Sequence, residues 1–413
     1  MGDGWEVRLP FYYGWVIFAI TFLIYMFMYG LRYSVGIFFT PIQSEFGWST
    51  AATASGVTIF YWVYAFAAPF VGQLAERIGV RRTVLIGGLL LGGGGALVSL
   101  VQELWMLYLF WGVLAAAGSA ALYVVPTMSL SKFFHRKRGL TVGWSSVGVS
   151  VGQAVIIPIV ASIIPILGWR STIKALGLTV LVVTSLIGFL FMREDPESMG
   201  LHPDGDSSPP LEEASSPSDY WFPRDAMKTT SFKLIAVSYF FAIGGITSIL
   251  TFVVPHMIRI GIPPVQASGA FGVIGLMSAV GSLLFGIVSD RYGRKIAILT
   301  TTLGMAAAFL VAVVIPADLT LLYGWAVLYG LSYGGSPEQY AAVITDYFGR
   351  KYNTSLFGVL TLAGGLGGGL FPLIGGWLVD QTGGYYVTLL FLGAGMALAT
   401  FTAYLVKKPK RLL

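Results

Sequence analysis

Long apolar runs recur along almost the whole of this chain. Many of them reach the roughly 18 residues that a helix needs to cross the ~30 Å hydrocarbon core of a bilayer. Only 11% of the 413 residues are charged, against about 25% in soluble domains. Because lipid cannot satisfy bare backbone N–H and C=O groups, runs of this kind cross a membrane as helices. The sequence therefore predicts an all-α membrane protein.

About twelve membrane spans are expected from these runs. They begin near Gly14, Ala51, Thr83, Met106, Gly139, Trp169, Ser231, Gln266, Ile296, Leu319, Thr354 and Tyr385. All but four of the Lys and Arg residues fall in one set of connections and tails; the exceptions are Arg32, Arg170, Lys174 and Arg259. Because basic residues are retained on the cytoplasmic side, both termini are predicted to be cytoplasmic, in a multi-pass protein of the cell (inner) membrane. The net charge of +6 is therefore a topology signal, and no nucleic-acid partner is expected.

Two loops between apolar runs repeat the same pattern 214 positions apart. Residues 72–82 and 286–295 both contain a Gly, an acid followed by Arg, a second Gly and a base. The same shift aligns these pairs: Glu76 with Asp290, Arg77 with Arg291, Arg81 with Lys295, Phe134 with Phe348, and Arg136 with Arg350. Two loops in one register indicate an internal duplication, which in membrane proteins is typical of transporters whose halves move about a central site.

The longest polar connection, residues 193–230, is rich in Pro, Ser and acidic residues. Such a composition cannot bury enough apolar surface to fold alone. We therefore expect an N-terminal six-helix bundle at 1–192, a flexible cytoplasmic linker at 193–230 and a C-terminal six-helix bundle at 231–413.

The first repeated loop reads Gly-x-Leu-Ala-Glu-Arg-x-Gly-x-Arg-Arg and resembles the signature loop of the major facilitator superfamily. Its position after the second span and its weaker copy in the second half strengthen the resemblance, which covers nearly the whole chain. Two softer similarities, Tyr13-Gly14-Trp15 and Pro196 to Gly205, look like the bacterial monocarboxylate-porter and oxalate/formate-antiporter branch.

The resemblance implies two pseudo-symmetric six-helix bundles and transport of a small organic anion, often by symport with a proton. The chain departs from the animal monocarboxylate porters in one respect. Those proteins carry an Asp and a substrate-binding Arg in span eight, whereas the stretch 277–282 has neither. Ser278 and Ser282 stand roughly where the charges would be, so the animal mechanism does not transfer directly.

Arg32 is the most informative single residue, because it lies inside the first apolar run. A charge at the bilayer centre costs roughly 2.5–3.5 kcal/mol on insertion scales and usually faces a cavity or a partner. Tyr29 and Gly36 lie on the same helix face, at i−3 and i+4. A guanidinium binds a carboxylate through two hydrogen bonds, so Arg32 and Tyr29 are predicted to bind an anionic substrate. The alternative is an arginine that snorkels toward the non-cytoplasmic surface.

Further substrate-binding candidates are polar residues within spans. They are Tyr123, Ser150, Gln153, Ser278, Ser282 and Tyr333. Helix packing is the alternative role for each, because polar stripes also join helices.

Glu338 is the carboxylate placed well inside a span, beside Pro337 in span ten. Burial favours the protonated form of a carboxylate, so Glu338 is the candidate for proton coupling. A structural partner for a nearby base is the equally weighted alternative.

The repeated loops also suggest a gate. An acid next to Arg at the junction of the two halves can form a charge network that closes the cytoplasmic side, which assigns gating to Glu76, Arg77, Asp290 and Arg291. The alternative is that these bases only set the topology.

No cysteine is present, and no His cluster offers metal-ligand spacing, so no cofactor, metal site or enzyme activity is expected. Export of drugs or amphiphiles by proton antiport remains the alternative transport function. Gly148 and Gly152 fit part of the span-five glycine pattern of drug antiporters, but Gln153 replaces its proline. A membrane sensor would carry a folded soluble appendage, which this sequence lacks. We expect a monomer in the lipid bilayer whose partners are a small organic anion and a proton.

Overall fold

The computed structural model describes residues 11–206, 221–349 and 352–409. In these ranges the regular structure is helical. The first part of the chain forms α1 (Gly14–Tyr33), α2 (Val35–Phe46), α3 (Thr50–Ile78), α4 (Val80–Leu97), α5 (Leu104–Leu107), α6 (Ala116–Phe133), α7 (Arg138–Val151), α8 (Ile157–Val182) and α9 (Gly188–Phe191). The second part forms α10 (Pro223–Lys228), α11 (Thr230–Arg259), α12 (Pro264–Tyr292), α13 (Arg294–Val314), α14 (Leu319–Gly334), α15 (Pro337–Phe348), α16 (Asn353–Thr382) and α17 (Tyr386–Leu405).

Ten described helical stretches are long and apolar enough to span a membrane. One of them, Leu140–Phe191, has 52 residues and turns at Gly168, whose positive φ of 74° is a conformation that glycine adopts without strain. It therefore supplies two spans. A further span is formed by α14 and α15, which are separated near Ser336. The predicted twelve-helix architecture is confirmed.

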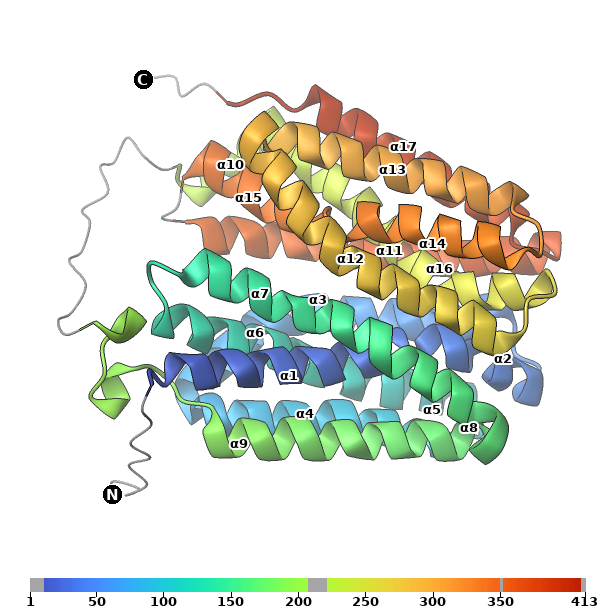
Figure 1. Cartoon of the computed structure of the whole chain (residues 1–413), viewed down its shortest axis with the longest axis horizontal. Coiled ribbons are helices and arrows are strands. Elements are labelled where there is room, and N and C mark those ends of the chain that lie inside the picture. The colour runs from blue at the N-terminus through green and yellow to red at the C-terminus, as the bar shows by residue number, and fades with distance from the viewer. Residues whose placement is uncertain (1–10, 207–220, 350–351, 410–413) are drawn as a thin grey trace.

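The helices form two bundles that lie side by side, with α1–α9 in one and α11–α17 in the other (Figure 1). The start of α1 and the end of α17 lie at the same end of the molecule as the end of α9 and α10, on the left in Figure 1. We call this the proximal end and the opposite end the distal end. The first span breaks at Ser34, between α1 and α2.

The bundles meet along the distal halves of their facing helices. At the distal end, Gly376 of α16 lies so close to α3 that an added Cβ would come within 2.9 Å of the Thr50 carbonyl oxygen. Midway along the same helices, a Cβ on Gly365 would lie 2.4 Å from the Ala65 Cβ. Ser150 and Ser278 meet at a similar depth. The contacts between the bundles therefore run from the distal end to about the middle of the molecule.

The internal repeat appears in the contacts as well as in the sequence. The Arg81 Nε donates a hydrogen bond to the Met192 carbonyl oxygen at 3.1 Å, and the Lys295 Nζ donates one to the Val406 carbonyl oxygen at 2.8 Å. Both the donors and the acceptors are 214 positions apart. In each bundle, a base of the repeated loop thus holds the proximal end of that bundle's last span.

Candidate functional site

Arg32 is buried near the centre of the molecule. The residue is 6% exposed, and its guanidinium carbon lies 5.3 Å from the ring centre of Tyr29, 5.1 Å from Phe60 and 4.6 Å from both Tyr61 and Tyr64. The electron-rich faces of aromatic rings attract a cation in this geometry. The side chain does not extend to the distal surface, so the geometry differs from that of a snorkelling arginine.

The guanidinium lacks a carboxylate partner in the described part of the chain. Its Nε has no hydrogen-bond partner, and the ion pairs of the described residues involve other bases. The strongest electrostatic influences on Arg32 besides desolvation come from tyrosines, among them Tyr33. Burying a charge without a counter-charge is unfavourable. Arg32 is therefore a buried cation without a negatively charged partner among the described residues.

The aromatic residues of α3 around Arg32 were not selected from the sequence. Phe60, Tyr61 and Tyr64 supply three of the four rings. Their spacing of three or four residues places them on one helix face, but spacing does not reveal that this face packs against α1. An apolar helix with tyrosines on one face was the available signal.

A small cavity adjoins Arg32 on its distal side, between α2, α3 and α11. Its walls include Val35, Val57 and Leu250, and its volume is about 10 Å³. That is room for about one water molecule. The space on the distal side of Arg32 is therefore too small for an organic molecule in this conformation.

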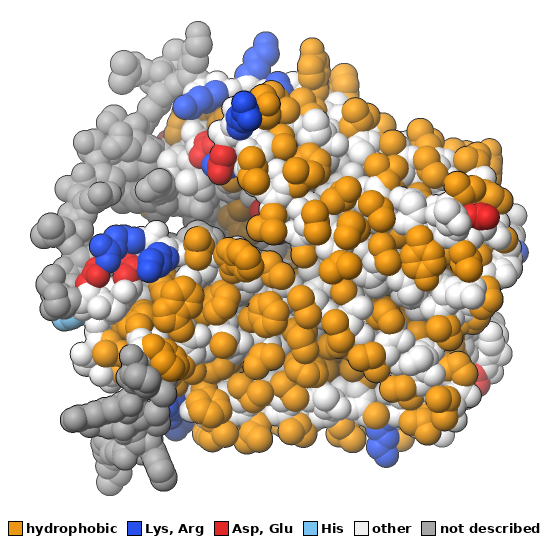
Figure 2. Space-filling view, in the orientation of Figure 1, with side chains coloured by type: hydrophobic (Ala, Val, Ile, Leu, Met, Phe, Trp, Pro, Cys, Tyr) orange, Lys and Arg blue, Asp and Glu red, His pale blue; other side chains and the backbone are white. Residues whose placement is uncertain are grey.

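Glu338 lies on the proximal side of Arg32. The Glu338 carboxyl lies deep in the molecule, but its side chain is accessible from the space between the bundles. It stands in the first turn of α15, just after the helix break at Ser336. Its charge reaches the hydroxyls of Tyr29, Tyr239 and Tyr333. Figure 2 shows the surface hollowed between the two bundles at the proximal end, where charged side chains gather on both sides.

Two predicted tyrosines lie close to this central region. The ring of Tyr123 stacks on Tyr25 with 5.6 Å between ring centres. The hydroxyl of Tyr333 is 3.2 Å from that of Tyr33, across the junction of the two bundles. Tyr29 therefore contacts Arg32 directly, whereas Tyr123 and Tyr333 contact other tyrosines near it, Tyr64 and Tyr33.

The remaining predicted binding residues lie elsewhere. The Ser150 and Ser278 hydroxyls hydrogen-bond to each other at 2.7 Å, and Gln153 Nε2 donates to the Phe271 carbonyl oxygen at 3.3 Å. These three residues therefore join α12 to the first bundle, which corresponds to the packing alternative. Ser282, one turn beyond Ser278, is half-buried.

The predicted gating residues are exposed at the proximal end. Asp290 pairs with Arg294 at 2.6 Å, not with its neighbour Arg291, and Arg294 also pairs with Asp346 at 3.1 Å. The described ion pairs include none for Glu76 or Arg77 and none between the bundles. Of the predicted gating residues, Asp290 alone forms a described ion pair, and that pair lies within the second bundle.

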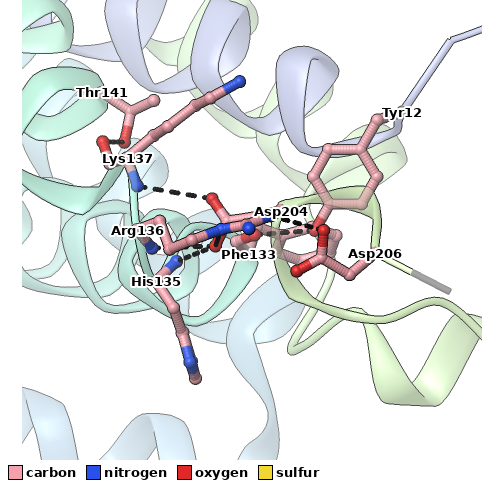
Figure 3. Close-up of polar contacts among 8 residues, drawn as sticks. All are labelled: Tyr12, Phe133, His135, Arg136, Lys137, Thr141, Asp204 and Asp206. Carbon is pink, nitrogen blue, oxygen red and sulfur yellow. Dashed lines mark hydrogen bonds and ion pairs between the residues drawn. The ribbon is translucent and has the colours of Figure 1, made fainter. Parts of the chain in front are cut away.

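The start of the predicted linker is docked on the first bundle. Figure 3 shows the Asp204 carboxylate against the loop that precedes α7. It accepts backbone hydrogen bonds from His135 at 3.0 Å, Arg136 at 2.8 Å and Lys137 at 3.4 Å. The Tyr12 hydroxyl donates to the Phe133 carbonyl oxygen nearby, at 2.7 Å. The expected boundary of the first bundle at 192 stays a prediction, although residues beyond it pack on that bundle.

The ionisation of two groups changes at this docking point. Burial opposes the charge on Asp204, but the three backbone N–H groups outweigh it and lower the pKa of the carboxyl. Burial raises the pKa of the Tyr12 phenol, and the nearby charges of Asp204 and Glu197 add to the effect. Asp204 is therefore charged and Tyr12 neutral at physiological pH.

Comparison with known proteins decides the family. The sequence model of the Major Facilitator Superfamily matches residues 21–281 and 235–412, which together cover nearly the whole chain. The chain belongs to the major facilitator superfamily. This membership makes the protein a membrane transporter rather than an enzyme.

Relatives and solved structures agree with the superfamily assignment. Monocarboxylate transporter 12 of Rattus norvegicus is 25% identical over 97% of this chain and 86% of its own length. Monocarboxylate transporter 11 of Homo sapiens is 28% identical, covering 92% of this chain and 80% of that protein. The fold is similar to that of a bacterial homologue of the human lysosomal transporter Spinster, in an inward-facing and unoccupied conformation. The TM-score is 0.76 with 17% identity, over 97% of this chain and 99% of that one.

Proposed function

We propose that this transporter moves a small organic anion, of the monocarboxylate class, across the cell inner membrane by alternating access. The observation that carries the proposal is Arg32, a buried guanidinium between the two bundles that has aromatic neighbours and no carboxylate partner in the described ranges. A carboxylate bound there would supply the missing counter-charge through two hydrogen bonds. Two of the relatives described above are monocarboxylate transporters, which supports the same substrate class.

Access to the site is from the proximal end in this conformation. The basic residues of the loops assign that end to the cytoplasm, with both termini there. The anion would pass Glu338 and the tyrosines and reach Arg32. The bundles would then close over it at the proximal end and part at the distal end. The proposed rigid units are residues 1–192 and 231–413, joined by the linker at 193–230.

Proton coupling is assigned to Glu338. The side chain is exposed to the space from which the substrate would enter, and its charge acts on Tyr29, as does that of Arg32. A proton on Glu338 removes a negative charge from the path of an anion. Binding of the proton and of the substrate would therefore favour each other, as symport requires.

The experiment is uptake of radiolabelled carboxylates by the purified protein in proteoliposomes, with and without an imposed pH gradient. We expect saturable uptake of at least one monocarboxylate, faster when the gradient drives protons in the direction of the substrate. Empty liposomes provide the background. Cationic amphiphiles in the same assay test drug efflux, and movement of these compounds without any carboxylate would contradict the proposal.

A further inference from the structure

The distal junction of the bundles contains a charged contact that crosses from one bundle to the other. Asp380 lies near the end of α16, in the second bundle. Its Oδ1 accepts a hydrogen bond from the Thr50 backbone N–H at 2.7 Å, and its Oδ2 accepts one from the Ala51 N–H at 2.8 Å. Thr50 and Ala51 are the first residues of α3, in the first bundle.

This contact supplies what α3 lacks in its own bundle. The first N–H groups of a helix have no partner within the helix. The side-chain hydroxyl of Ser49, the residue before α3, accepts a hydrogen bond from the Ala52 N–H, at 3.1 Å. The N–H groups of Thr50 and Ala51 are satisfied by the second bundle. The positive end of the α3 dipole also favours a carboxylate at this position.

The neighbouring contacts between the bundles are neutral. The Thr58 hydroxyl donates to the Gly369 carbonyl oxygen at 2.8 Å, and Tyr33 meets Tyr333 through their hydroxyls. Hydrogen bonds that involve a charged group are stronger than neutral ones. Asp380 also lies at the distal limit of the interface, so its bonds must break before α3 and α16 can part at that end.

We propose that Asp380 is the distal latch of the transporter. It holds the distal side closed by capping α3 from the opposite bundle, and it releases that helix when the distal side opens. The proposal rests on the alternating-access cycle above and adds a residue that controls the balance between its two states. Because Asp380 is exposed, water can replace its partners when they part, so the latch is reversible.

The chain itself offers a matched control. Asp318 also caps a helix at the distal end, and its Oδ1 accepts from the Leu321 N–H of α14 at 2.9 Å. That contact lies within the second bundle. Asp318→Asn keeps one oxygen acceptor, which is all that this cap uses. Asp380→Asn replaces one of two accepting oxygens with an NH2 group that faces a backbone N–H.

The test measures opening of the distal side without substrate. The chain has no cysteine, so Val57→Cys introduces a single thiol beside the buried distal cavity. Its reaction with a maleimide that cannot cross membranes, added from the distal side of oriented proteoliposomes, reports distal opening. We expect Asp380→Asn to accelerate the reaction by about three- to thirty-fold, in line with loss of a helix cap, and Asp318→Asn to leave it unchanged.

The outcomes separate the latch from the proposed substrate. Asp380→Glu keeps the charge but displaces it by one methylene, and its rate should fall between those of the parent and Asp380→Asn. Parental rates in both Asp380 variants would overturn the latch, as would equal acceleration by Asp318→Asn. Because no anion is present in this assay, failure of the carboxylate panel leaves its result intact. If carboxylate uptake is normal and the Asp380 variants react with the maleimide at the parental rate, the latch proposal is wrong and the proposed function stands.

Discussion

The two ends of the molecule differ in whether a described charged group binds the opposite bundle. At the distal end, the Asp380 carboxylate binds the backbone of the opposite bundle. At the proximal end, the described ion pairs lie within one bundle or its docked linker, as between Arg294 and Asp346 or Arg136 and Asp206. The distal contacts therefore hold this conformation together.

The two repeated loops also differ in the ion-pair partners of their acidic residues. Asp290 pairs with Arg294, which also holds Asp346. The corresponding positions in the first bundle, 214 residues earlier, are Glu76, Val80 and Lys132. Valine replaces the arginine, and a base replaces the second acid. Glu76 is thus the acid of the two loops that lacks a base one turn onward, which leaves it available to the opposite bundle.

The largest expected effect comes from joining the proximal ends. A disulfide between Glu76→Cys and Asp290→Cys should reduce transport to background, because the proximal side could no longer open, and a reductant should restore it. The matched control is Asp290→Cys with Asp346→Cys, which joins residues of one bundle and should leave transport largely intact. Normal uptake by the fully crosslinked Glu76 and Asp290 variant would contradict the gate.

Arg32 lies between the two ends, and its replacement should affect binding in either state. Hydrogen bonds to charged groups contribute roughly 1.5–3 kcal/mol, so Arg32→Ala should weaken anion affinity about ten- to a hundred-fold. Arg32→Lys should recover only part of this, because an ammonium does not make the two-pronged contact. Ligand affinity of purified variants is the measurement, with the exposed base Lys174→Ala as the control. Parental affinity in Arg32→Ala would exclude the assignment.

Glu338 tests whether the open proximal path also carries the proton. Glu338→Gln preserves shape and removes the titratable group, so uptake should lose its response to an imposed pH gradient while substrate binding remains measurable. Uptake measured across a pH series gives the answer. Asp346→Asn, which removes a carboxylate nearer the proximal surface, serves as the control. An unchanged pH profile in Glu338→Gln would assign coupling to another group.

The smallest effect is expected where a charge is paired within one bundle. Asp204→Ala removes a cap from the loop before α7 and should lower the free energy of unfolding by about 1–2 kcal/mol, with the KM for the anion unchanged. The folded protein lowers the pKa of Asp204. Its contribution is therefore present above the unfolded value of about 4 and is lost as pH falls through the folded value. Denaturant unfolding at pH 7 and at pH 3 measures both effects. An equal difference between variant and parent at the two pH values would contradict the proposed role.

The fold followed from the sequence because apolar length and the repeated loops are local signals. The twelve spans and the two bundles needed no knowledge of which helix touches which. The site was predictable only in part for the same reason. Arg32 was found because a charge inside an apolar run is unusual, whereas Tyr61 and Tyr64 were missed because only packing shows that they face it. Asp380 was missed because an acid at the end of a span resembles any polar residue near the membrane surface.

The helix break at Ser336 was also missing from the sequence prediction. Glu338 stands in the first turn after this break and is accessible from the space between the bundles, which its position in the apolar run did not indicate. Ser150, Ser278 and Gln153 were selected as polar residues within spans, and polarity alone does not distinguish a substrate contact from a bond between helices. The bonds that these three residues form result from the packing of α12 against the first bundle.

The Arg32 guanidinium, which has no carboxylate partner among the described residues, also affects how the substrate can be found. A ligand that binds only the folded protein adds RT ln(1 + [L]/Kd) to its stability, about 2.7 kcal/mol at a hundredfold excess over Kd. A carboxylate that neutralises Arg32 should therefore raise the melting temperature of the detergent-solubilised protein, without any liposome or gradient. The same compound should raise the melting temperature of Arg32→Ala much less, because its affinity for that variant is lower. A thermal-shift screen of carboxylates against this pair of proteins could thus name the cargo before any transport has been measured.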